Sequence, residues 1–210
     1  MPRRTPAEPE PAPDAEPDAA ARIREAALEL FATRGFHGTG IRQLAERAGL
    51  SSATLYHYMG TKEDLLVALM TGGLDRLIAL AEAVEAEEPD PLRRLAALVR
   101  LHVREHAERP RETRVVDDQI GVLDGAARDA VVALRDRYED VWRRALDPLV
   151  GDPRVALADA AAAALARRAL LEMCTGVAHW YRADGALRLE ALGEAHAAMA
   201  LRLVGATSPR

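Results

Sequence analysis

The sequence predicts an all-α fold in which an N-terminal three-helix bundle precedes a larger helical domain. Three observations support this prediction. Apolar residues recur at helical spacing along most of the 210 residues, and no segment alternates in the manner of a β-strand. Glycine and proline interrupt these helical patterns at intervals, without any internal repeat. Residues 41–62 read IRQLAERAGLSSATLYHYMGTK, which predicts two short helices joined by a tight turn.

Composition restricts the class of protein. The chain is 49% hydrophobic, yet it has no run of about 18 uninterrupted apolar residues that would predict a membrane span. Its N-terminus lacks the apolar centre of a secretory signal, and a lone cysteine, Cys174, cannot form an internal disulfide. We therefore expect a cytoplasmic protein with no membrane partner, in which Cys174 is a buried apolar residue rather than a nucleophile.

The net charge of −5 is unevenly distributed along the chain. Residues 1–21 carry −3, residues 22–62 carry +3 and residues 63–210 carry −5. A basic segment on an acidic body would restrict contact with DNA to one end, although small imbalances also arise by chance. The acidic, proline-rich leader is expected to be a flexible arm, whose Arg3 and Arg4 could reach a DNA groove or stay solvated.

The 41–62 stretch has the features of a helix-turn-helix, which places its second helix in the DNA major groove. Its first helix has one apolar face, formed by Ile41, Leu44, Ala45 and Ala48. Gly49 is expected to end that helix in the left-handed conformation, and Ser51 to cap the next one.

The second helix, about Ser52 to Tyr58, is expected to bury Leu55 and Tyr58, which are three positions apart. Its outer face then carries small, hydroxylated and aromatic side chains and no carboxylate, which suits approach to a phosphate backbone. The alternative is an ordinary surface helix rich in serine and threonine.

Two flanking positions are expected to meet phosphate. Thr61 and Asp64 form a capping box at the start of the next helix, beside the only lysine of the chain, Lys62. Thr39 is expected to cap the first helix of the motif, with its hydroxyl near free N–H groups. A lysine at a helix start is otherwise often only solvated.

From Arg22 to Leu69 the sequence resembles the DNA-binding domain of the TetR family of transcriptional repressors. The resemblance lies in IREAALELFATRGFHGTG, IRQLAERAGLSSATLYHY and MGTKEDLL, and it departs from the family at Met59, where phenylalanine is usual. Methionine is a flexible apolar substitute, so the packing should be kept. The resemblance implies a sequence-specific repressor that binds double-stranded DNA, and the candidate DNA contacts are Thr39, Arg42, Ser51, Ser52, Thr54, Tyr56, His57 and Lys62.

Three parts are expected along the chain. These are the leader at 1–18, a DNA-binding domain at 19–66 with its motif at about 41–60, and a helical ligand-binding and dimerisation domain at 67–210. A long helix should run from Lys62 to about Val84, with Thr71-Gly72-Gly73 as the place where it could kink. Other helices are expected at 19–34, 92–108, 112–123, 126–149, 153–180 and 187–204.

The last two predicted helices resemble the dimerisation pair of TetR-family proteins. The alanine-rich segment 154–168 would allow close helix packing across a twofold axis, or it could be an ordinary core helix. A homodimer implies a near-palindromic operator, because two recognition helices must enter successive major grooves about 34 Å apart.

The C-terminal domain is loosely similar to a TetR branch that responds to acyl-CoA thioesters and controls lipid or sterol breakdown. The ALRDRYE and WYRADG segments carry this similarity. The alternative is an efflux-type repressor of the same fold that responds to a drug. The effector pocket is expected among the helices after Pro91, and its candidate residues are His102, Gln119, Trp142, Met173, Val177 and Trp180.

Metal binding and catalysis are the remaining alternatives. His102 and His106 have the i, i+4 spacing of a metal pair, which Asp117 and Asp118 could complete, but a polar helix face explains them more simply. No orienting partner, phosphate loop or paired carboxylates support an enzyme, which is kept only as a remote alternative of unknown class. We expect no catalytic residue, no metal and no cofactor.

Overall fold

The computed structural model describes residues 16–206, so Arg3 and Arg4 lie outside the described residues. Every regular element in the described range is a helix, which confirms the all-α prediction. None of these helices is both long enough and apolar enough to cross a bilayer. The elements are α1 Glu16–Arg34, α2 Ile41–Ala48, α3 Ser52–Met59, α4 Lys62–Glu87, α5 Pro91–Glu108, α6 Pro110–Asp118, η1 Ile120–Val122, α7 Gly125–Leu146, η2 Asp147–Leu149, α8 Ala160–Thr175, α9 Val177–Trp180 and α10 Leu189–Leu203.

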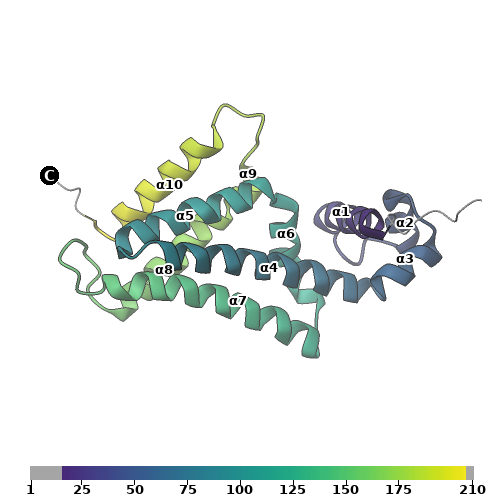
Figure 1. Ribbon diagram of the computed structural model, residues 1–210, viewed down its shortest axis with the longest axis horizontal. Helices are drawn as coiled ribbons and strands as arrows, with labels where there is room; N and C mark the ends of the chain where they lie inside the picture. Colours follow the sequence, from purple (N-terminus) through teal and green to yellow (C-terminus); the bar gives the residue numbers. More distant parts are fainter. Residues whose placement is uncertain (1–15, 207–210) are drawn as a thin grey trace, which may run out of the picture.

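The molecule is elongated, with a small head at one end and a larger helical body at the other (Figure 1). The head consists of α1, α2, α3 and the start of α4, packed around Phe31, Leu44, Leu55 and Leu66. The body packs α5, α7, α8 and α10 around a second core that includes the fully buried Trp142. The core of the head continues into Val115 and Val116 of α6, so the head and body are in direct contact.

Helix α4 connects the head to the body as one continuous helix of 26 residues (Figure 1). Gly72 and Gly73 therefore do not interrupt it. Gly73 is buried, and a Cβ atom at this position would lie 3.0 Å from Oε1 of Glu112 on α6. The glycine is thus explained by the close approach of α6 rather than by a kink.

The predicted helix at 153–180 begins too early and is interrupted at Gly176, although helical structure does end at Trp180. Residues 153–159 are not helical, because Asp152 accepts a hydrogen bond from the Arg154 backbone N–H and Ala156 donates to the carbonyl of Val204. Helix α8 begins only after Asp159, whose carboxylate caps it by accepting from Ala162. It ends at Thr175, and the short helix α9 follows Gly176.

Candidate functional site

The turn between α2 and α3 has the geometry of a helix-turn-helix. Gly49 ends α2 with a left-handed φ of 67°, as the sequence predicts. The hydroxyl of Ser51 accepts a hydrogen bond of 3.0 Å from the backbone N–H of Thr54 and so caps α3. Thr61 and Asp64 form the predicted capping box at the start of α4. The local sequence signals therefore fix the position of α3 on both sides.

Helix α3 is anchored through Leu55 and Met59, both buried, and not through Leu55 and Tyr58. The prediction that Tyr58 points inward is wrong, because the helix packs through positions four apart rather than three. Tyr56 is 52% exposed and Tyr58 is 38% exposed. The ring of Tyr58 lies edge-on to that of His57, with centroids 5.5 Å apart. Tyr58 is therefore not a core residue, and it lines a shallow hollow beside Ile23 of α1 and Leu65 of α4.

Lys62 is half-buried, and its charged end is hydrogen bonded within the head. Its Nζ donates hydrogen bonds of 2.8 Å to the carbonyls of Phe36 and Thr39, and it lies 4.1 Å from the centre of the Phe36 ring. Burial lowers the pKa of this lysine. These contacts fasten α4 to the turn between α1 and α2. The phosphate contact expected from the position of Lys62 at a helix start stays a prediction.

Thr39 is also placed differently from the prediction. Gly40, not Thr39, is the residue that precedes α2 as its cap. Thr39 is only 1% exposed, and its hydroxyl donates to the carbonyl of Gly35 at 2.8 Å. The hydroxyl is therefore used inside the turn.

The remaining predicted DNA contacts stay near the outer surface of the motif. Arg42, Ser51 and His57 are exposed, whereas Ser52 and Thr54 are half-buried. The hydroxyls of Ser51 and Thr54 lie 2.8 Å apart. Helix α3 contains no acidic residue, so its exposed face does not repel phosphate.

The body contains a cavity of about 760 Å³ between α4, α5, α6, α7 and α8. Its inner end is formed by buried side chains, among them Leu74, Leu77 and Tyr138. Its outer end is lined by exposed residues of α8 and α9, including Arg168 and His179. The walls combine apolar surface with many charged groups, which suits a ligand that has both characters.

His102 and His106 lie stacked at the inner end of the cavity. Their ring centroids are 3.8 Å apart with an interplanar angle of 6°, and both side chains are buried. His102 is hydrogen bonded to the hydroxyls of Tyr138 and Thr175, and Nδ1 of His106 contacts the His102 carbonyl at 2.8 Å. Burial lowers the pKa of His102 well below its usual value and that of His106 to about 4. Both rings are therefore neutral near pH 7.

These positions correct the interpretation of the histidine pair as a polar helix face, because both rings point into the protein. Within residues 16–206, no group of three or more histidine, cysteine or acidic side chains is arranged to hold a metal ion. Cys174 is fully buried, as predicted, and burial raises the pKa of its thiol to about 12.

Of the six predicted pocket residues, His102 lines the cavity and the other five do not. Trp142 and Val177 belong to the apolar core, and Met173 packs against that core. The side-chain oxygen of Gln119 accepts a hydrogen bond of 2.9 Å from the Phe36 N–H. Trp180 is 53% exposed and stacks on His196. Apolar residue type alone could not separate a cavity wall from a packed core.

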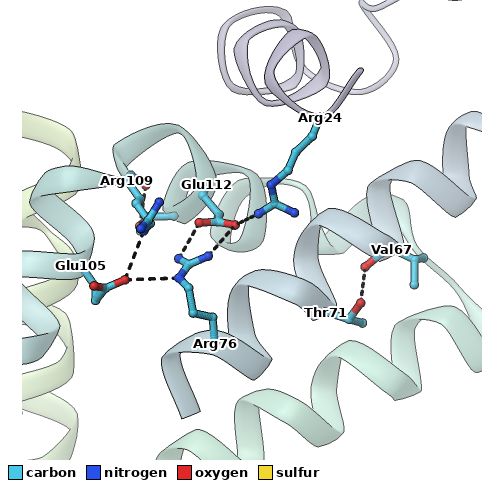
Figure 2. A network of polar contacts seen from close by, with 8 residues as sticks. Arg24, Val67, Thr71, Arg76, Glu105, Arg109 and Glu112 are labelled. Carbon is cyan, nitrogen blue, oxygen red and sulfur yellow. Dashed lines mark hydrogen bonds and ion pairs between the residues drawn. The ribbon is translucent and has the colours of Figure 1, made fainter. Parts of the chain in front are cut away.

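A network of charged side chains forms part of the cavity wall (Figure 2). Glu112 of α6 forms ion pairs with Arg24 of α1 and with Arg76 of α4, the latter at 2.7 Å. Arg76 also lies 3.4 Å from Glu105, which in turn contacts Arg109 at 3.3 Å. Only the Glu105–Arg109 pair has a spacing signal, being four residues apart at the end of α5. Arg24, Arg76 and Glu112 come from separate helices that only the fold brings together.

Comparison with known proteins identifies the family. Residues 23–69 match the family model for bacterial regulatory proteins of the tetR family, and residues 88–204 match the tetracyclin repressor-like C-terminal domain. The HTH-type transcriptional repressor KstR2 of Rhodococcus jostii (strain RHA1) is 26% identical over 188 residues, covering 89% of this chain and 90% of that protein.

Solved structures give the same result. The TetR-family regulator PfmR of Thermus thermophilus is 34% identical with a TM-score of 0.77, covering 86% of this chain and 97% of that one. AibR, solved in complex with isovaleryl coenzyme A and operator DNA, is 23% identical with a TM-score of 0.78, covering 90% and 100%. KstR2 and PfmR are named as a repressor and a regulator rather than as enzymes. Because one family model alone covers more than half of the chain, this protein belongs to the TetR family of bacterial regulatory proteins.

Proposed function

We propose that this protein is a homodimeric repressor that binds a near-palindromic operator through α3 and leaves it when a small effector enters the body cavity. The observation that carries this proposal is the exposed outer face of α3. Tyr56 and His57 are both exposed on a short helix that has no carboxylate and is capped at both ends. Such a face can enter a major groove and contact both base edges and phosphates.

The charge distribution supports contact at the head alone. Residues 22–62 carry a net charge of +3, whereas residues 63–210 carry −5. Arg42 on α2 is an exposed cation close to the turn, and it is well suited to a phosphate contact. An acidic body would be repelled by the duplex, so the head would be held as the end that touches DNA.

Exposed apolar residues on α8 and α10 support the homodimer. Leu165 on α8 is 70% exposed, and Met199 and Leu203 on α10 are 39% and 43% exposed. Large exposed apolar side chains on neighbouring helices are typical of an interaction surface. Two half-sites one turn apart require a twofold dimer that presents both copies of α3 to the same face of a duplex.

For the effector we favour an acyl-CoA thioester. Likeness to AibR, whose solved complex contains isovaleryl coenzyme A, supports this class. The cavity has apolar inner walls for an acyl chain and several guanidinium groups for phosphates or carboxylates. The alternative is a hydrophobic drug, as in an efflux-type repressor, and the same apolar walls would accommodate it.

Selection of duplexes from a random library by the full-length protein tests the proposal. We expect enrichment of a near-palindrome whose half-site centres are about one helical turn apart. Thermal shift with isovaleryl-CoA, octanoyl-CoA and a cationic dye then separates the effector classes, because a ligand that binds only the native state raises the melting temperature. A protein that enriches no duplex, or that sediments only as a monomer when bound to one, contradicts the proposal.

A further inference from the structure

Among the described residues, two ion pairs join α6 to α1 of the head, and they differ in how exposed their side chains are. Arg24 of α1 pairs with Glu112, and the next residue of α1, Glu25, pairs with Arg111 at 2.6 Å. The Glu25–Arg111 pair is at the surface, where the two side chains are 60% and 50% exposed, and neither residue lines the cavity. Glu112 does line the cavity, and its side chain is only 8% exposed.

The inner charged network has an excess of positive charge. Three guanidinium groups, those of Arg24, Arg76 and Arg109, face two carboxylates, those of Glu105 and Glu112. Arg109 is 48% exposed, and its contact with Glu105 is a long one of 3.3 Å. Arg76 and Arg109 both line the cavity. Arg24 lies outside the cavity, so the two guanidinium groups and two carboxylates of the network that line it balance. What an anion in the cavity would find is the half-exposed guanidinium group of Arg109, which has spare donors.

We propose that Glu112 couples the cavity to the head, and that the coupling is operated by an anionic group on the effector. A carboxylate or phosphate attracted to Arg76 and Arg109 competes with Glu112 for Arg76 and repels the Glu112 carboxylate. Because the same carboxylate holds Arg24, its displacement loosens the attachment of α1 to α6. The consequence for DNA binding rests on the function proposed above.

The packing explains how this change would reach α3. Glu112 cannot move toward α4, because its side chain already packs against Gly73. A Cβ atom added at Gly73 would lie only 3.0 Å from Oε1 of Glu112. A displaced carboxylate must therefore move together with α6 or away from Arg24. Helix α1 packs directly on α2, and α2 leads through the tight turn into α3. A small change at Glu112 thus alters the orientation of the DNA-binding face relative to the body, as in other two-state helix shifts.

The adjacent residues Arg24 and Glu25 provide a matched pair of test variants. Arg24→Gln removes the head's link to Glu112 and leaves the cavity residues in place, and Glu25→Gln removes a surface ion pair between the same two helices. We expect Arg24→Gln to increase hydrogen–deuterium exchange of α1 and α6 amides in the ligand-free protein, and Glu25→Gln to leave it unchanged. Arg24 is 41% exposed, so this variant is expected to fold. Equal exchange in both variants overturns the coupling.

The choice of an anion is tested with three probes that share an eight-carbon chain. Octanoate carries a carboxylate, octanoyl-CoA carries phosphates, and octanamide is neutral. We expect one or both anionic probes to raise the melting temperature of the wild-type protein and of Arg24→Gln more than octanamide does. If octanamide is as effective as both anions, or if no probe binds, the anionic class is wrong.

Affinity for the selected duplex tests the coupling through Glu112 and the anionic effector together. With the anionic probe bound, wild-type and Glu25→Gln proteins should lose at least about tenfold in affinity, and Arg24→Gln less than about twofold. Equal losses in all three proteins overturn the coupling through Glu112 and leave the repressor proposal intact. If no duplex is bound by the wild-type protein, the proposed function fails, and the exchange experiment still decides whether the ion pair couples the two lobes.

Discussion

Adjacent glycines in α4 give a sharp test of how the head and body are joined. Glycine costs a helix interior about 1 kcal/mol relative to alanine, so an alanine that meets no obstacle should stabilise the protein. At Gly72, which is exposed, a new Cβ would lie 3.7 Å from an Arg24 nitrogen, an ordinary contact. At Gly73 it would lie 3.0, 3.1 and 3.2 Å from three atoms of the Glu112 side chain. The neighbouring substitutions should therefore have opposite effects.

The magnitude at Gly73 follows from the bonds that hold Glu112. Moving its carboxylate weakens charge-assisted hydrogen bonds that contribute about 1.5–3 kcal/mol each, and partial relaxation reduces that loss. We expect Gly72→Ala to stabilise the protein by about 0.5–1 kcal/mol and Gly73→Ala to destabilise it by about 1–2 kcal/mol. For a chain of this size each kcal/mol shifts the melting temperature by about 2–4 °C.

Calorimetry or urea unfolding of the two variants measures this difference. In a Glu112→Ala background the obstacle is absent, so Gly73→Ala should become as stabilising as Gly72→Ala. If Gly73→Ala stabilises the otherwise wild-type protein as much as Gly72→Ala does, the close approach of α6 to α4 is wrong.

Three further predictions concern single side chains. Lys62→Met should lower the free energy of unfolding by about 1–2 kcal/mol in urea melts, because it deletes two hydrogen bonds to backbone carbonyls; an unchanged stability would contradict this role. Burial lowers the pKa of His106 from 6.5 to about 4. As the pH falls from 6.5 towards 4, His106 takes up a proton in the unfolded state but not in the folded state, so the free energy of unfolding decreases. The loss at about pH 5 is about 2 kcal/mol for this residue, so His106→Phe should be less acid-sensitive by that amount. Cys174, whose thiol pKa is raised to about 12, should react with iodoacetamide at least about a hundredfold more slowly in the native protein than in urea.

The head could be predicted closely because its signals are local. Gly49, Ser51 and the Thr61–Asp64 capping box act within one or two helical turns, so residue type and spacing are enough to place them. Tyr58 was misplaced because spacings of three and four are both helical, and only the burial of Met59 in the head core decides between them. An amphipathic pattern cannot make that choice alone.

The hydrogen bonds of Lys62 could not be derived from sequence because they join separate elements. The bond of Thr39 is local, to the carbonyl of Gly35 four residues earlier, but residue type alone does not distinguish it from a helix cap. A lysine at a helix start is compatible with phosphate binding, but here the α1–α2 turn brings two carbonyls to its Nζ. The cavity posed the same difficulty. Trp142 and His102 both lie on buried helix faces, yet only His102 reaches the cavity, because the gap is created by how α4 to α8 pack.

The most direct test of the account is the affinity of the Tyr56→Ala protein for the selected duplex, measured by fluorescence anisotropy over a range of salt concentrations. We predict at least a tenfold loss of affinity, equivalent to about 1.4 kcal/mol, and no loss for Arg104→Ala, which removes an exposed cation from α5. Arg42→Ala should weaken binding and reduce the salt slope by about 1. Unchanged affinity in both head variants, or an equal loss in Arg104→Ala, would contradict the claim that the outer face of α3 and its neighbours form the DNA-binding surface.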